Sequence, residues 1–171
     1  YMTGILPIKK YGTHSALNMF SEFSMTNPRQ LAEYVGFTES EVKELCEQYH
    51  MNLDEVKEWY DGYQFEQVPS IYSPKSVIEA VTSGVCDTYW NQTETFEALH
   101  MYIDMNFEGL RDDVLSMMAG EKIPVNTGSF SNDMTTFYSE DDVFTLLIYL
   151  GYLGYDFYNK CVFIPNYEIR G

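Results

Sequence analysis

The stretch WYDGYQFEQVPSIYSPKSV, residues 59–77, decides how the rest of the chain is arranged. Gly62 is of the residue type that most often ends helices, and the Ser73-Pro74 pair is typical of a helix start. Aromatic side chains fill much of the sequence between these two signals. We therefore expect one helix to end near Gly62, an aromatic extended segment to cross, and a second helix to begin at Pro74.

Three helix-start signals precede this stretch. Asn27-Pro28 predicts a short helix that runs to about Tyr34, and Thr38–Glu41 forms a capping box. Asn52–Glu55 repeats the start signal for the helix that ends at Gly62. Helical spacing predicts inward-facing side chains in the second and third of these helices: Val42, Leu45, Cys46 and Tyr49, then Val56, Trp59 and Tyr60.

Short extended pieces and further helices follow. Residues 63–65 and 71–72 favour strands, and Pro69 between them limits pairing. Further helices are expected from Pro74 to about Thr82, over residues 95–103, and from Asn106 to a stop at Gly120. Residues 121–125 are compatible with a strand. The predicted core faces are Val77, Ile78 and Val81, then Phe107, Leu110, Val114, Leu115 and Met118.

The C-terminal part predicts a buried helix followed by a β-hairpin. Residues 143–150 are apolar on all sides and follow a cap at Ser139, so this helix should be central. Residues 154–157 and 161–165 flank Asn159-Lys160 as two strands. The expected fold class is therefore mainly α, a helical lid-type domain with short β pieces and a C-terminal β-hairpin, in an arrangement similar to a winged helix.

The acidic composition of the chain limits the classes of partner that it can bind. The chain of 171 residues carries a formal net charge of -16, which repels phosphate backbones and anionic lipid surfaces. We expect neither nucleic acid nor membrane as a direct partner. Cys46, Cys86 and Cys161 are too far apart for a metal knuckle or a disulfide framework, which favours reduced thiols in a cytoplasmic protein.

The chain shows no motif of a known reaction. A P-loop, a GxSxG elbow, an HExxH and a GxGxxG are all absent from the sequence. The scattered acidic residues Asp61, Asp133, Asp141, Asp142 and Glu168 show no spacing that favours an acid–base pair or a metal site. The aromatic clusters allow two interpretations, a tyrosine-rich core or a stacking platform for a sugar or base.

Eight motifs, in order along the chain, carry a family resemblance. They are TGILPIKKYGTHSALN (3–18), GFTESEV (36–42), WYDGY (59–63), IYSPKSV (71–77), YWNQT (89–93), NDMT (132–135), LGYL (150–153) and IPNYEI (164–169). With them the chain resembles the bacterial predicted AAA-ATPase-like family, whose members often carry a PD-(D/E)xK nuclease-like domain after the ATPase part. The resemblance spans essentially the whole chain.

The resemblance implies that this chain is the C-terminal part of an ATPase-like region. The family's P-loop segment would precede Thr3, and the nuclease-like domain would follow residue 169. The chain does not begin with methionine, which fits an expected cut from a larger protein. Residues 1–26 would be the end of a core strand and its loop, and residues 27–171 the helical lid, with a division near 84–95 as an alternative.

The resemblance also implies a sensor and a packed hinge. Thr3, followed by Lys9 and Lys10, matches the position of a γ-phosphate sensor. ATP and Mg²⁺ are expected for the full-length protein and no cofactor for this chain alone. The motifs around residues 59–74 have no catalytic role to transfer, and we expect them to pack as a hinge in which Asp61 binds backbone amides. The structural or interface residues are Trp59, Tyr60, Asp61, Gly62, Tyr63, Tyr72, Ser73, Pro74 and Trp90.

Two hypotheses of function follow. The chain is either the lid and sensor portion of an ATP-dependent switch, inactive alone, or a helical module that binds a protein or glycan through aromatic side chains. An open groove lined by Trp59, Tyr63 and Trp90 would favour the second. An exposed apolar patch around residues 1–8 would favour the first.

Overall fold

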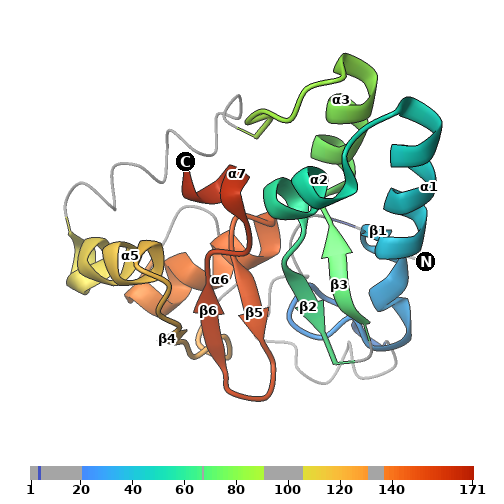
Figure 1. The fold of residues 1–171 in the computed structure, drawn as a ribbon. Coiled ribbons are helices and arrows are strands. Elements are labelled where there is room, and N and C mark those ends of the chain that lie inside the picture. Colours follow the sequence, from blue (N-terminus) through green and yellow to red (C-terminus); the bar gives the residue numbers. More distant parts are fainter. Residues whose placement is uncertain (1–3, 5–20, 67, 91–105, 131–136) are drawn as a thin grey trace.

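The computed structural model describes residue 4 and residues 21–66, 68–90, 106–130 and 137–171. Over these residues the chain is dominated by helices and adds two small antiparallel sheets of three strands each (Figure 1). The expected fold class is confirmed. Thr3, Lys9, Lys10, the helix expected over 95–103 and Asp133 lie outside the described residues.

The N-terminal lobe, residues 21–90, holds one sheet and its covering helices. Its elements are η1 (Arg29–Tyr34), β1 (Phe37–Thr38), α1 (Glu39–Tyr49), α2 (Leu53–Tyr60), β2 (Tyr63–Phe65), β3 (Val68–Tyr72) and α3 (Pro74–Ser83). The strand order is β1-β3-β2, with Phe37 opposite Tyr72 and Tyr63 opposite Ile71. Pro69 lies in the half of the central strand that β1 does not reach, so its missing N–H costs no bond to β1.

Local signals account for the helix starts of this lobe. The capping box forms at α1, where the Thr38 amide and hydroxyl donate to Glu41 Oε2 at 2.8 and 2.7 Å. At α2, Asn52 Oδ1 accepts from the amides of Asp54 and Glu55 at 2.9 and 3.3 Å. Both predicted caps are confirmed. The helix expected from Pro28 is instead a 3-10 helix without a side-chain cap.

The C-terminal lobe, residues 106–171, is built around one buried helix. Its elements are η2 (Phe107–Gly109), α5 (Leu110–Met118), β4 (Ile123–Pro124), α6 (Glu140–Leu150), β5 (Gly154–Asp156), β6 (Cys161–Phe163) and α7 (Tyr167–Arg170). Of the residues predicted to be buried, 143–148 are buried, and Tyr149 and Leu150 are partly buried. The acidic Asp142 is buried with them. The β5–β6 hairpin is confirmed, and β4 adds a third strand in the order β4-β6-β5.

Several expected core residues are exposed. Tyr49 and Ile78 are 47% and 45% exposed, and Leu115 and Met118 are 54% and 46% exposed. The buried positions of α3 are 76, 77, 80 and 81, which share one side of the helix, and Ile78 falls on another side. The apolar spacing correctly predicted that α3 is a helix and that Val77 and Val81 are buried. It wrongly added Ile78, which lies outside the face that other elements cover.

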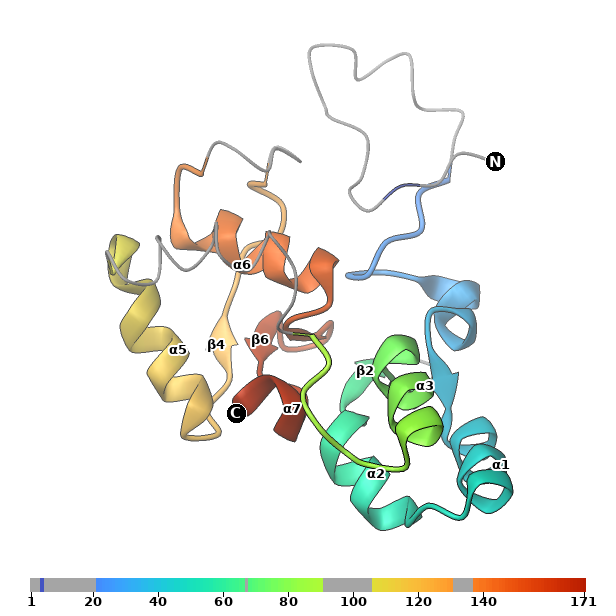
Figure 2. The same ribbon diagram turned by 90° about the horizontal axis from the view of Figure 1, so that it is seen from above.

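The two lobes have separate hydrophobic clusters and meet along one face. Val42, Val56, Tyr60, Tyr72 and Val77 belong to the first cluster, and most buried residues of α6 belong to the second. We call the face where α2 and β2 meet α7 and β5 the seam (Figures 1 and 2). Tyr89 is the last residue of the first cluster, whereas Trp90 and also Met25 pack against the second. Whether the lobes are independent domains stays a prediction.

No helix within the described ranges is long and apolar enough to cross a membrane.

Candidate functional site: the seam between the lobes

Sequence motifs that lie far apart along the chain meet at the seam. The Trp59 ring packs edge-on against the Tyr167 ring, with centroids 4.8 Å apart. The Tyr63 hydroxyl donates to the Gly151 carbonyl, 88 positions further on. Residues 59–63 therefore contact both the turn after α6 and the C-terminal helix α7.

Gly62 lies directly against the backbone of the second lobe. Its φ is +124°, a conformation that side chains rarely adopt, and a Cβ placed there would lie 1.9 Å from the Pro165 carbonyl oxygen. Gly62 was predicted to end a helix, and it also lets the chain pack against Pro165. Asp61 is the C-cap residue of α2. Its Oδ1 accepts hydrogen bonds from the Gly62 amide and from the Ser70 hydroxyl, both at 2.7 Å. Its predicted bond to a backbone amide is confirmed.

Trp90 connects the two lobes. Its indole Nε1 donates to Ser73 Oγ at 3.1 Å, and Ser73 Oγ also lies 3.0 Å from Ser76 Oγ. On its other side the Trp90 ring packs against Tyr152 of the second lobe, with centroids 5.2 Å apart. Ser73 therefore receives the indole N–H and makes no side-chain cap of α3, which begins with Pro74 as predicted.

Residues 85–90, which we call the strap, lead from α3 to the seam without joining a helix or strand. Side chains hold it from both sides. The buried Tyr60 hydroxyl donates to the Asp87 carbonyl and accepts from the Asp87 amide, both at 2.9 Å. Lys75 Nζ donates to the Tyr89 carbonyl at 2.9 Å.

Glu168 of α7 fixes the end of the strap. Its side chain is 97% buried, and Oε1 accepts from the Tyr89 amide at 2.7 Å. Oε2 is buried and makes no hydrogen bond within the described part of the chain. Burial raises the pKa of this carboxyl, although Ser76, the amides of Tyr89 and Trp90, and Lys75 act in the opposite direction.

Three buried tyrosines of the N-terminal lobe are neutral. Burial is the largest influence on Tyr60, Tyr63 and Tyr72, and it raises the pKa of each hydroxyl well above its usual value. They are therefore uncharged at physiological pH. The Tyr60 and Tyr63 hydroxyls bind backbone groups, whereas the buried Tyr72 hydroxyl makes no hydrogen bond within the described residues. None of the three has the lowered pKa expected of a tyrosine that works as a base.

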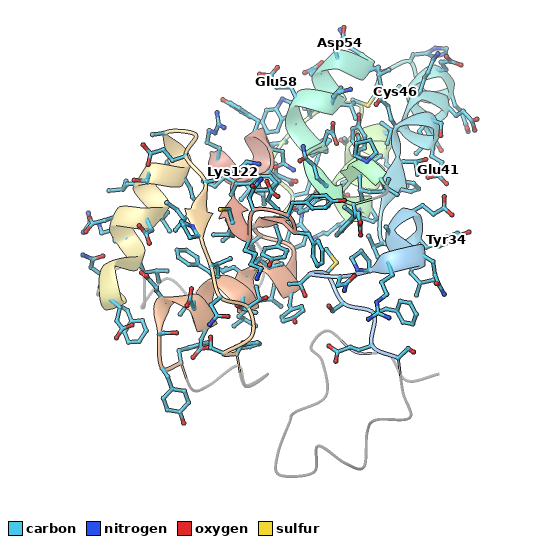
Figure 3. The ribbon with its side chains drawn as sticks, turned by 90° about the horizontal axis from the view of Figure 1, so that it is seen from below. Tyr34, Glu41, Cys46, Asp54, Glu58 and Lys122 are labelled. Carbon is cyan, nitrogen blue, oxygen red and sulfur yellow. The ribbon has the colours of Figure 1, made fainter. Side chains whose placement is uncertain are left out.

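The candidate carboxylates are not brought together. Asp61, Asp141, Asp142 and Glu168 each bind a different backbone amide, at residues 62, 126, 138 and 89. Within the described residues no group of three His, Cys, Asp or Glu side chains could hold a metal ion. The labelled acidic side chains of α1 and α2 lie on the outer side of these helices (Figure 3), as expected for a solvated face.

The predicted aromatic residues are thus gathered, but they pack against protein. Tyr63 is 94% buried, and Trp59 and Trp90 are partly buried against Tyr167 and Tyr152. The sequence indicated Trp59, Tyr63 and Trp90 as structural or interface residues, and that role stays a prediction; Glu168 was given no role. Its position between Tyr167 and Ile169 in the IPNYEI motif was the available signal.

No protein-family model, no curated protein and no solved structure matches this chain. The family resemblance of the motifs therefore stays a prediction.

Proposed function

We propose that this chain is the lid portion of an AAA-type, ATP-dependent switch and is not catalytic alone. One observation favours a lid rather than a binding module. The aromatic motifs pack inside the seam, where they hold the two lobes together. A lid that closes over a nucleotide must move as a connected body, and packing of this kind provides the connection. A cytoplasmic location is part of the same proposal.

The seam weighs against the glycan- or protein-binding alternative. Stacking on a ligand requires an accessible ring face. Tyr63 is buried with its hydroxyl bound to Gly151, and Trp90 bridges Ser73 and Tyr152. These residues would have to leave their partners before a ligand could stack on them.

In this proposal the nucleotide binds to the P-loop segment, which in the family precedes the position of Thr3. The chain itself has no P-loop sequence, and the described residues form no group for Mg²⁺. Thr3 is proposed as the γ-phosphate sensor by its position in the family motif.

Calorimetric titration of ATP with Mg²⁺ tests the proposal. We expect no binding heat with residues 1–171 and clear binding with a longer chain that includes the P-loop segment. In the longer chain, Thr3→Ala should lower ATP hydrolysis at least tenfold, while the exposed Thr82→Ala control should leave it unchanged. Binding by neither chain would overturn the proposed function and favour an interaction module.

A further inference from the structure

Glu168 stands out because its buried carboxyl group is only half satisfied. Oε1 accepts the Tyr89 amide at 2.7 Å, whereas Oε2 makes no hydrogen bond within the described residues although it is buried. Leaving a charged oxygen unpaired in the interior is costly, because water can no longer solvate it. The ionised carboxylate is therefore poorly accommodated in the closed seam.

The surroundings provide little charge to offset this cost. Lys75 of α3 is the cation that acts on Glu168, and it is exposed, with its Nζ directed to the Tyr89 carbonyl. Tyr60 of α2 and Tyr63 of β2 face the carboxylate as neutral phenols, and each interacts with it unfavourably when ionised. From the strap, Tyr89 and Trp90 contribute their amides, and Ser76 of α3 contributes its hydroxyl; all three favour the ionised form. Burial remains the largest influence on Glu168.

The strap is able to respond to Glu168 because side chains hold it. Tyr60, Lys75 and Glu168, on three different helices, bind its backbone, and no strand pairing adds to them. Ser83 and Ser73 of the adjoining α3 and its cap also bind residues of the strap. Figure 2 shows the strap passing α7 on its way from α3. Its last residue, Trp90, reaches the second lobe through Tyr152. Glu168 therefore binds the residue next to Trp90, whose contact with Tyr152 joins the lobes.

We propose that Glu168 is a proton-controlled latch: the neutral carboxyl keeps the strap docked across the seam, and ionisation releases its Tyr89–Trp90 end. Ionisation strengthens the single bond to the Tyr89 amide, but it also requires water at Oε2. Lifting the strap admits that water. This latch goes beyond the proposed lid function, since it needs no nucleotide and would operate in this chain alone.

The direction of the pH effect follows from burial. Because the pKa of Glu168 is raised in the folded protein, its contribution to docking is fully present below the usual carboxyl value of 4.5. That contribution is lost as the pH rises through the raised value. The strap should therefore be tighter in mildly acidic solution and looser at neutral pH.

Trp90 offers a direct readout, because the chain has two tryptophans and Trp59→Phe leaves it as the only one. We expect its emission maximum to shift to longer wavelength between pH 4.5 and 8 in one single-proton transition. Adding Glu168→Gln, which keeps an oxygen for the Tyr89 amide, should abolish the transition. The matched control Glu79→Gln, on the exposed side of α3, should leave it intact.

Two further measurements do not depend on the Gln variant folding. Lys75→Met removes the cation that favours ionisation, so the midpoint should move to higher pH. Hydrogen exchange of the unmodified protein should show at least a tenfold lower protection factor for the Tyr89 amide above the transition than below it. An unchanged transition in Glu168→Gln, no transition in the parent, or equal protection at both pH values would overturn the latch. ATP titration does not enter these tests, so the latch and the lid can fail separately.

Discussion

Replacing Gly62 by alanine should do more damage than any other single-methyl change at the seam. The φ of +124° is costly for any residue with a Cβ, about 1–3 kcal/mol. The new methyl would also lie 1.9 Å from the Pro165 carbonyl oxygen, so one of the two backbones must move by about 1 Å. Together we expect a loss of about 3–5 kcal/mol, a large share of the 5–15 kcal/mol that stabilises a typical domain.

Gly84→Ala is the matched control. Gly84 ends α3 with φ +75°, and a Cβ there would meet nothing within 4 Å. Only backbone strain of about 1–2 kcal/mol is therefore expected. The difference between the two variants isolates the contact with Pro165.

Urea unfolding followed by both circular dichroism and tryptophan fluorescence measures the effect. Trp59 and Trp90 both lie at the seam, whereas circular dichroism reports the helices of both lobes. For Gly62→Ala the fluorescence transition should come at lower urea than the dichroism transition, because the seam opens first. If Gly62→Ala costs no more than Gly84→Ala, the close approach of the lobes at this point is wrong.

Three further outcomes are expected. Tyr60→Phe removes both hydrogen bonds to the backbone of Asp87 and should lower the free energy of unfolding by about 1–3 kcal/mol in urea titrations. Asn52→Ala should cost about 1 kcal/mol by the same assay, because α2 loses its cap, whereas Asn52→Asp should cost little. Hydrogen bonds from Asn159, together with a nearby lysine, lower the pKa of Asp156. The stabilisation by the Asp156 carboxylate should therefore be present above about pH 4 and be lost on acidification. Asp156→Asn should flatten the acid part of the curve of unfolding free energy against pH. An unchanged acid limb in Asp156→Asn would show that this carboxylate does not stabilise the hairpin.

Local signals predicted much of the fold. The capping box at Thr38 and the cap at Asn52 need only neighbouring residues, so they could be inferred without knowing what packs on the helices. The hairpin around Asn159-Lys160 and the buried helix α6 followed for the same reason. Burial was predicted less well at Tyr49 and Leu115, because the neighbouring elements decide how wide the covered face of a helix is.

The site was harder to predict because it consists of long-range contacts. The motifs at 59–63, 71–77, 89–90, 150–153 and 164–169 were each visible in the sequence. Nothing in them shows that Tyr63 would reach Gly151 or that Gly62 would lie against Pro165. Glu168 was named among the acidic residues but given no role, because one acidic residue in so acidic a chain does not stand out until its burial is known.

The long span of the seam contacts has a consequence for biosynthesis. The Tyr63–Gly151 and Tyr89–Glu168 hydrogen bonds join residues 88 and 79 positions apart. All members of the first hydrophobic cluster lie before residue 90, so that lobe can pack while the ribosome is still making the second. During that interval Trp59 and Trp90 have no partner from the second lobe. A pause in translation between residues 90 and 168 would therefore prolong the exposure of this aromatic surface to chaperones or to other nascent chains.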